Sequence, residues 1–309
     1  MELIRGIHNL RARHRGCVVT IGAFDGVHQG HQAVLSHLLE KSKKLGLPSV
    51  VVVFEPLPRE YFAPEKAPAR LMSFREKFRA FEDIGIDRVL RIRFNEFIRT
   101  MSAREFIEKI FVSGLGMHYI VAGDDQRFGH DREGDFELLE SMGEQCGYHA
   151  MHTDTLGREG GRVSSTRIRT ALEASEFELA EELLGRPYSI SGRVIYGQQL
   201  GRQLDAPTAN LRLYSYRIAM SGVYAVEVSG LGEDIMYGVA NVGVRPTLGK
   251  SIKAILEVHL IDFDREIYGR TIKVIFRKKI RDEKKFSSLD ELKTNIHKDI
   301  ATGRQYFNL

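Results

Sequence analysis

Short apolar segments alternate with stretches of helical periodicity between residues 17 and 155. The pattern predicts strands at residues 17–22, 50–54, 88–92 and 119–123, with helices at about 31–45, 73–84 and 103–114. Apolar strands joined through helices form a parallel sheet that is covered on both faces. Because ligands of such sheets bind beyond the carboxyl ends of the strands, those ends are where a site is expected.

The pattern changes after residue 165. One helix is expected at about residues 166–184, and short alternating strands follow it. These strands are predicted at 189–194, 222–228, 236–242, 253–261 and 271–276, before a last helix at about 288–302. Short strands at this spacing are typical of an antiparallel barrel. We therefore expect an α/β domain at residues 1–185 and a small antiparallel β-barrel domain with a C-terminal helix at residues 186–309.

Composition excludes several classes of protein. Two cysteines, Cys17 and Cys146, are too few for a disulfide scaffold or a zinc cluster. No apolar run approaches the ~18 residues that cross a bilayer, and the first five residues become charged too early for a signal peptide. With 43% hydrophobic and 28% charged residues, extended disorder is excluded as well. We expect a cytoplasmic protein that has no membrane partner.

The second half of the chain is basic. Residues 186–309 carry 20 Lys and Arg against 13 Asp and Glu, whereas residues 1–185 carry 25 against 28. This predicts an anionic partner, either a nucleic acid or a phosphorylated small molecule. The basic cluster at 277–281 is short and is interrupted by Ile280. Such a cluster favours a solvated strand end or a small-anion site over a nucleic-acid surface, so we expect no nucleic-acid partner.

A glycine-rich loop with two histidines follows the first predicted strand, at residues 21–31 (Ile-Gly-Ala-Phe-Asp-Gly-Val-His-Gln-Gly-His). Its glycines permit a tight turn and close approach of a phosphate, and the helix that follows offers free N–H groups to an anion. His28 and His31 are three residues apart and can donate hydrogen bonds to phosphate oxygens. The same spacing occurs in metal sites, but no third ligand is evident, which favours phosphate.

The glycine-rich loop resembles the string Gly-x-Phe-Asp-Gly-Val-His-x-Gly-His of the prokaryotic bifunctional riboflavin kinase/FMN adenylyltransferases, or FAD synthetases. Further strings of that family follow in order across both halves, so the resemblance covers about residues 3–308. It implies a Rossmann-like nucleotidyltransferase domain followed by a β-barrel flavokinase domain. It also implies two reactions, riboflavin to FMN in the second domain and FMN to FAD with release of pyrophosphate in the first. ATP is the implied co-substrate and Mg²⁺ the implied cofactor of both.

For the adenylyltransferase, the resemblance implies ATP contacts from the glycine-rich loop and from the Ser-Ser-Thr segment near residue 165. These contacts are Gly22, Phe24, Asp25, Gly26, His28, Gly30, His31, Arg162, Ser164, Ser165, Thr166 and Arg169. His28, His31 and Arg169 are the implied catalytic residues, since adenylyl transfer needs positioning and charge neutralisation rather than a covalent nucleophile. The Ser-Ser-Thr segment is also an ordinary helix start.

The flavin contacts that the resemblance implies in the same domain are Pro56, Pro58, Phe62, Asp125 and Phe128. Phe62 and Phe128 can equally be aromatic core residues. Gln126 stands where the family string has an aromatic residue, which bears on the affinity for FMN.

For the kinase, the resemblance implies ATP contacts from Gly192, Gly197, Gly201, Arg202, Pro207, Thr208 and Asn210. Thr208 and Asn210 would hold Mg²⁺ through oxygens, the donors that this ion prefers, although Pro-Thr-Ala-Asn is also typical of a turn. Glu257 aligns with the catalytic glutamate that accepts the proton of the riboflavin 5′-hydroxyl. Arg281 and Phe286 are the implied flavin contacts. His259 shares a strand face with Glu257 and is interpreted as structural.

Two alternatives remain at this stage. Gln126, or Asp205-Ala206 in place of the family's Gly-Phe, could leave the chain with only one of the two activities. The chain could instead be a flavin- or nucleic-acid-binding regulator built on the same folds. Nothing in the sequence indicates the oligomeric state.

Overall fold

The computed structural model describes residues 1–123, 126–153, 156–158, 161–197, 204, 206–213, 217–246 and 252–309. The chain forms two compact units. The first comprises Met1–Ala67 and Phe74–Ser164, and the second comprises Pro68–Ser73 and Ser165–Leu309.

The first unit is an α/β structure. Its sheet strands are β1 (Glu2–Arg5), β2 (Cys17–Ile21), β3 (Ser49–Phe54), β4 (Arg88–Ile92), β5 (Met117–Gly123) and β6 (His149–Thr153). Its helices are α1 (Gln29–Leu45), α2 (Pro58–Phe62), α3 (Phe74–Ile84), α4 (Glu96–Arg99), α5 (Ala103–Phe106), which continues as the π-helix η3 (Ile107–Gly114), and α6 (Phe136–Cys146). Shorter elements are the 3-10 turns η1 (Ile7–Asn9), η2 (Ala12–His14) and η4 (His130–Arg132) and the hairpin of β7 (Gly157–Arg158) and β8 (Gly161–Arg162).

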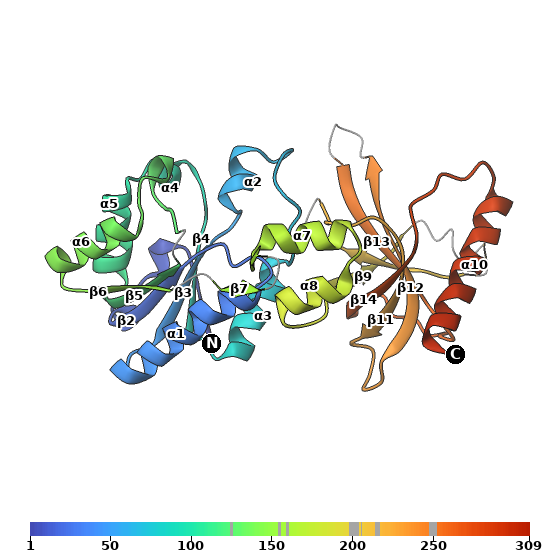
Figure 1. Cartoon of the computed structure of the whole chain (residues 1–309), viewed down its shortest axis with the longest axis horizontal. Coiled ribbons are helices and arrows are strands. Elements are labelled where there is room, and N and C mark those ends of the chain that lie inside the picture. Colours follow the sequence, from blue (N-terminus) through green and yellow to red (C-terminus); the bar gives the residue numbers. More distant parts are fainter. Residues whose placement is uncertain are drawn as a thin grey trace. The chain divides into compact units, whose positions relative to one another are not determined.

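The six strands of this sheet are all parallel and lie in the order β1-β4-β3-β2-β5-β6. After β2 the chain adds β3 and β4 on one side, then crosses over to add β5 and β6 on the other. The direction of winding therefore reverses at β2, and the crevice at such a switch point is where open α/β sheets bind ligands. The glycine-rich loop leaves the sheet at this point, between β2 and α1 (Figure 1).

Helices cover both faces of the sheet, as the alternating pattern predicts. On one face Val19, Val50 and Leu90 pack in a buried cluster with Phe106 and Phe111. The other face is covered by α1, which packs on β2, β3 and β5. The strands between the edges are largely enclosed on both sides, so most of their residues are apolar without strict alternation. This is why the strands stand out in the sequence.

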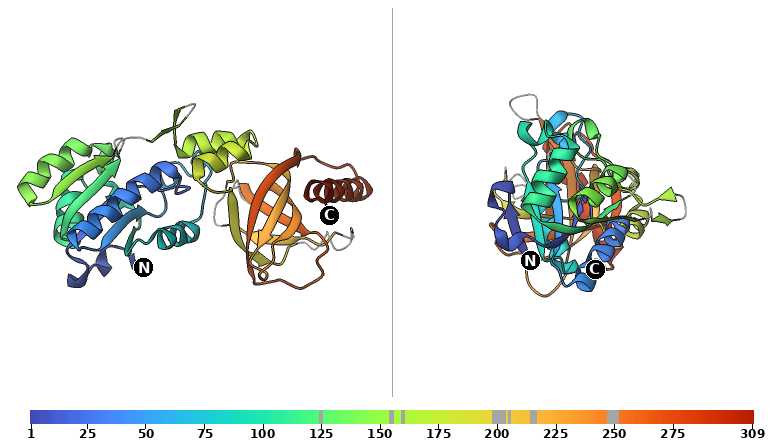
Figure 2. Two further views of the ribbon diagram at one scale, coloured as in Figure 1. Left: turned by 60° about the horizontal axis from the view of Figure 1, so that its bottom comes forward. Right: turned by 90° about the vertical axis from the view of Figure 1, so that its left-hand side faces the viewer.

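The second unit is built on a closed antiparallel barrel. Its strands are β9 (Ser189–Ile195), β10 (Ala209–Arg212), β11 (Gly222–Ser229), β12 (Met236–Pro246), β13 (Ile252–Leu260) and β14 (Thr271–Arg281). They lie in the order β10-β13-β12-β11-β14-β9, and β9 pairs with β10 to close the barrel. The helices of this unit are α7 (Ser165–Glu173), α8 (Phe177–Leu184) and α10 (Leu289–Phe307). Figure 2 shows α10 lying along the side of the barrel.

One predicted element is wrong: the single helix at 166–184 is two helices, α7 and α8. Ser175 adopts a left-handed conformation with φ of 61° and breaks the helix there, although neither glycine nor proline marks the position in the sequence. The break turns α8 so that Phe177 contacts the rings of Tyr224 and Phe276, which are buried in the barrel. Strands β1, β6 and β10 and helix α6 were not among the predicted elements.

Helix α10 rests on the barrel through a glycine. A Cβ atom at Gly303 would lie 2.7 Å from Cγ2 of Val239 on β12, closer than two carbon atoms approach. The C-terminal helix can therefore sit this close to the strands only because residue 303 has no side chain.

We expect Gly303→Val to destabilise the second unit by about 1–3 kcal/mol, because the added side chain forces α10 away from Val239. Denaturant unfolding followed by circular dichroism measures the change. Ala301→Val, at an exposed position of the same helix, is the control and should change stability by less than about 0.5 kcal/mol. Equal effects of the two substitutions would show that the close contact at Gly303 does not matter.

Candidate active sites

The glycine-rich loop is held in one shape by contacts between its own residues. Phe24 and Val27 have positive φ angles of 46° and 40°, and Gly26 has a φ of 88°. A Cβ at Gly22 would lie 2.9 Å from the ring of Phe24. A Cβ at Gly30 would lie 3.3 Å from the ring of His28 and 3.4 Å from a backbone carbonyl oxygen. The loop thus folds tightly around aromatic rings, and this packing, rather than flexibility, requires the glycines.

The two histidines are stacked at the N-terminus of α1. His28 is the N-cap, and its Nδ1 accepts a hydrogen bond of 3.3 Å from the backbone N–H of His31. The ring centroids are 3.6 Å apart at an angle of 16°, and the ring of Phe24 contacts His31 from another side. Stacked imidazoles direct their in-plane lone pairs along parallel lines, whereas the ligands of one metal ion converge. The geometry therefore favours a phosphate over a metal ion at this pair.

Burial keeps His31 neutral. Desolvation lowers the pKa of His31 well below 6.5, and the nearby charges of His28, Lys77 and Arg162 lower it further. Its Nδ1 is enclosed and has no hydrogen-bond partner among the residues that the structure describes. A neutral ring can donate one hydrogen bond, while Lys77 and Arg162 supply the positive charge around it.

Lys77 is a member of this site that the sequence analysis missed. It lies on α3, is 1% exposed, and its Nζ donates a hydrogen bond of 2.6 Å to the carbonyl of Ala23 in the glycine-rich loop. A signal was present, because Lys77 stands between Phe74 and Phe81 on the apolar stripe of its helix. A lysine at such a position is almost never fully buried without a partner. Here it connects the loop to α3.

The predicted residues around position 165 are divided between the two units. Arg162 and Ser164 belong to the first unit, where the carbonyl of Val163 lies beside Gly30. Ser165, Thr166 and Arg169 lie on α7 in the second unit. There, Nε of Arg169 donates a hydrogen bond of 2.6 Å to the carbonyl of Ala69, so this arginine anchors the segment Pro68–Ser73.

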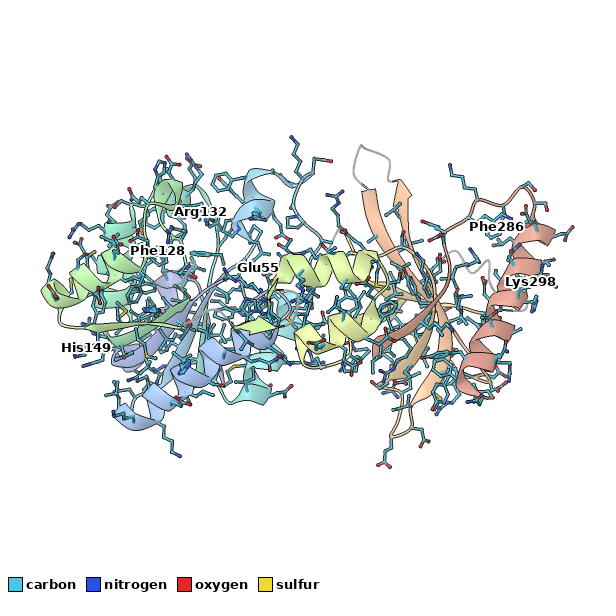
Figure 3. All side chains as sticks on the ribbon, in the orientation of Figure 1. Glu55, Phe128, Arg132, His149, Phe286 and Lys298 are labelled. Carbon is cyan, nitrogen blue, oxygen red and sulfur yellow. The ribbon has the colours of Figure 1, made fainter. Side chains whose placement is uncertain are left out.

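The expected flavin contacts of the first unit have different environments. Pro56 follows β3 and Pro58 begins α2. Phe62 is 61% exposed and its ring contacts that of Phe94. Phe128, labelled in Figure 3, is 4% exposed, and its ring contacts that of Phe106. An exposed ring can stack on a planar ligand, while Phe128 has the environment of a core residue. Asp125 lies outside the described residues.

Three polar side chains lie in a row on three adjacent strands of the barrel. Glu257 on β13 pairs with Asn210 on β10 and with Asn241 on β12. Residues that are directly opposite in antiparallel strands point to the same face, about 5 Å apart. Glu257 therefore stands between two amide side chains, on the outer face of the barrel, because Leu256 and Val258 on either side of it are buried. Asn241 was not predicted as a site residue.

Asn210 of this row lines a pocket of about 420 Å³, whereas Glu257 and Asn241 are not among its described lining residues. Its lining includes Gly197, Pro207, Thr208, Asn210 and Tyr268. A Cβ at Gly197 would collide with the side chain of Asn210, so the glycine leaves the space that the amide occupies. Thr208 and Asn210 thus both line the pocket, and a residue larger than glycine at 197 would displace the Asn210 amide.

Of the other predicted kinase residues, Gly192 has a structural role in the barrel. Gly192 is buried, and a Cβ there would lie 3.0 Å from Cβ of Leu211 and 3.1 Å from the carbonyl oxygen of Arg212, so it permits close pairing of β9 with β10. Gly201, Arg202 and the unusual Asp205 lie outside the described residues.

Arg281 joins β14 to α10. Its Nε and Nη2 donate to the carboxylate of Asp299 at 2.9 and 2.8 Å, and its guanidinium lies 5.5 Å from the ring of Phe286. Phe286 lies in the segment between β14 and α10 (Figure 3). Asp299 is only 6% exposed, so this bidentate pair is a structural connection, and the sequence analysis did not find it.

The basic cluster at 277–281 is largely neutralised within the unit. Arg277 makes two hydrogen bonds of 3.0 Å to Glu227, which raise the pKa of its guanidinium. Lys279 pairs with Asp282, and Arg281 pairs with Asp299 as described above. The excess of positive charge in the sequence therefore does not translate into a patch of unpaired cations on β14.

Two family models match the chain. The FAD synthetase model matches residues 10–167, and the riboflavin kinase model matches residues 184–307. The chain is 52% identical over 304 residues to the bifunctional riboflavin kinase/FMN adenylyltransferase of Pseudomonas fluorescens, covering 98% of this chain and 97% of that protein. It is 50% identical over 310 residues to the protein of the same name from Escherichia coli strain K12, covering 100% and 99%.

The chain belongs to the bifunctional riboflavin kinase/FMN adenylyltransferase family. The resemblance drawn from the glycine-rich loop is thereby confirmed, as is the combination of a nucleotidyltransferase-type parallel sheet with an antiparallel barrel. The identity extends over the full chain, so both matched domains are shared with these relatives.

A solved structure described as a macrolide-efflux protein from Streptococcus pneumoniae has the same overall fold. Its TM-score is 0.80 at 29% identity, covering 98% of this chain and 99% of that one. Within the residues described for the present chain, no helix is long and apolar enough to cross a membrane.

The lowered pKa of His31 leads to a test by NMR. We expect the His31 ring to stay neutral at pH values where an ordinary histidine, with a pKa of 6.5, has already taken up its proton, because its folded-state pKa lies well below 6.5. Since the unfolded chain takes up this proton near 6.5, the free energy of unfolding should decrease as the pH falls below that value. The NMR signal of the His31 ring is identified by its absence from the spectrum of the His31→Phe variant. A titration midpoint at or above 6.5 would contradict the buried, neutral ring.

Proposed function

We propose that this chain carries out two consecutive ATP-dependent reactions, phosphorylation of riboflavin to FMN and adenylylation of FMN to FAD. The row Asn210–Glu257–Asn241 beside a pocket of about 420 Å³ is the observation that supports this most directly. It places a carboxylate next to oxygen donors for a nucleotide complex, which is what phosphoryl transfer to a hydroxyl needs.

In the kinase reaction, Glu257 is the proposed general base. The 5′-hydroxyl oxygen of riboflavin attacks the γ-phosphorus of ATP, ADP leaves, and the hydroxyl proton passes to the Glu257 carboxylate. Asn210 and Asn241 on either side hold the carboxylate in place through the strand register. Arg281 and Phe286 are the proposed flavin contacts, and Gly192, Gly197, Gly201, Arg202 and Pro207 complete the proposed nucleotide contacts of this domain.

Thr208 and Asn210 fit the magnesium ion that the family implies. Both line the pocket together with Gly197 and carry neutral side-chain oxygens, and oxygen donors with few protein ligands suit Mg²⁺ when a nucleotide supplies the others. When bound, the ion would neutralise charge on the phosphates.

In the adenylyltransferase reaction, the glycine-rich loop is the proposed phosphate cradle. A phosphate oxygen of FMN attacks the α-phosphorus of ATP and pyrophosphate leaves, with no proton to be removed from the nucleophile. The chain has only to orient the groups and stabilise negative charge. We assign this to His28, His31, Arg162 and Arg169, with Gly22, Phe24, Asp25, Gly26, Gly30, Ser164, Ser165 and Thr166 as further ATP contacts. Pro56, Pro58, Phe62, Asp125 and Phe128 are the proposed flavin contacts.

We assign the adenylyltransferase domain to residues 1–185 and the kinase domain to residues 186–309. The proposed partners are riboflavin, FMN and ATP, without nucleic acid or membrane. Three of the four cations of the basic cluster, Arg277, Lys279 and Arg281, already have carboxylate partners. The proposed location is the cytoplasm, where ATP is available.

Separation of the flavins formed from riboflavin, ATP and Mg²⁺ tests the proposal. The wild-type protein should form FMN first and FAD second. Glu257→Gln should lower the rate of FMN formation by roughly 10²–10⁴-fold, because the amide cannot accept the proton, and it should still convert supplied FMN to FAD. If the protein forms FMN but no FAD, only the kinase activity is present. If it forms FAD only from supplied FMN, only the adenylyltransferase activity is present. Binding of flavin or nucleic acid without any product would indicate a regulator.

Lys77 gives a test of the N-terminal site. Lys77→Met should lower kcat/KM for FMN adenylylation by roughly 10–100-fold, because it removes a buried cation and the hydrogen bond to Ala23. Riboflavin phosphorylation by the same protein is the internal reference. Arg79→Met, which removes an exposed cation from the same helix, is the control and should have no effect. Equal losses in the two variants would exclude a specific role for Lys77.

A further inference from the structure

His259 connects the Pro-Thr-Ala-Asn segment to the strand that carries Glu257. It lies on β13 two residues after Glu257 and faces the same side of the strand. Its Nδ1 is 3.0 Å from the carbonyl oxygen of Pro207. A carbonyl oxygen can only accept, so Nδ1 carries the proton and donates this hydrogen bond. The tautomer of His259 therefore follows from its partner.

This hydrogen bond stands where the backbone pairing ends. The pairing of β10 with β13 runs through Asn210–Glu257 and Ala209–Val258 and goes no further. Before Ala209 come Thr208 and then Pro207, which has no N–H and cannot extend a ladder. Pro207 keeps its carbonyl as an acceptor, and the side chain of His259, rather than a backbone N–H of β13, donates to it. This hydrogen bond therefore fastens the residues just before β10, including Thr208, to β13.

The surroundings of His259 keep the ring uncharged and oriented. Burial lowers the pKa of His259, and the positive charges of His297 and Arg304 on α10 lower it further. The Pro207 carbonyl and Asp262 act in the opposite direction, and Asp262 is itself paired with Arg304. The ring thus sits between the C-terminal helix and the Pro207 segment. Pro207, Thr208 and Asn210 line the pocket, whereas His259 is not among its described lining residues.

We propose that His259 is a positioning residue of the kinase, which holds Pro207 so that Thr208 and Asn210 present their oxygens to the nucleotide complex at the level of Glu257. The inference rests on the proposed function of this pocket. His259 acts through Pro207 and not by touching the substrate, so its loss should weaken the binding of MgATP while leaving the binding of riboflavin unchanged.

Two substitutions separate the hydrogen bond from the bulk of the ring. His259→Asn keeps an N–H donor close to the position of Nδ1, and His259→Leu keeps volume but removes the donor. We expect His259→Leu to raise KM for MgATP in riboflavin phosphorylation about tenfold, with KM for riboflavin unchanged, and His259→Asn to stay within about threefold of the wild type. FMN adenylylation by the same protein is the internal reference. Lys298→Leu, at an exposed position of α10 that takes no part in the surroundings of His259, is the control.

Several outcomes would overturn the inference. An unchanged KM for MgATP in His259→Leu would do so, as would equal losses in the Leu and Asn variants or a parallel rise in KM for riboflavin. If His259→Leu does not fold, His259→Gln replaces it, since its donor lies further from the backbone and should miss Pro207. A wild-type protein that does not phosphorylate riboflavin would refute the proposed function instead. Calorimetric titration with MgATP would then still test whether His259→Leu weakens nucleotide binding.

Discussion

The tight turn between β2 and α1 is the constraint on which the N-terminal site depends. The chain leaves a strand buried on both faces and must start a helix within a few residues, which places the rings of Phe24, His28 and His31 against one another. This stack leaves no room for a Cβ at Gly22 and little at Gly30. The same packing desolvates His31, so that its pKa falls and the ring stays neutral.

The C-terminal site depends on strand register rather than on a turn. Closure of the barrel brings β10, β13 and β12 side by side, and the register sets Glu257 between Asn210 and Asn241. A shift of one residue in either pairing would turn Glu257 away from both amides. The pairing of β10 with β13 ends at Ala209. Beyond that point, the side chain of His259 donates a hydrogen bond to the carbonyl of Pro207. The position of Glu257, the proposed general base, and the positions of Asn210 and Asn241 are thus decided by one set of backbone contacts.

Buried charges in both units are held by specific partners. Lys77 reaches a backbone carbonyl in the loop it supports, and Asp299 accepts two hydrogen bonds from Arg281. Removing one partner from such a pair leaves an uncompensated charge and costs more than an exposed pair of the same type. This difference explains why the basic cluster at 277–281, which suggested an anion site from the sequence, serves in large part to fasten α8 and α10 to the barrel.

The sequence by itself determined the fold class, the family and most of the candidate residues, because buried strands are apolar throughout and the glycine-rich loop needs its residues in a fixed order. It also indicated Glu257 and the pair Thr208 and Asn210, though only by resemblance. Only the tertiary structure decided what these residues contact. Lys77, Asn241 and the bond from His259 to Pro207 join segments far apart in the chain, and local patterns carry no information on such contacts. The break at Ser175 was equally hidden, because it depends on Phe177 packing against Tyr224 and Phe276 and not on a local breaking residue.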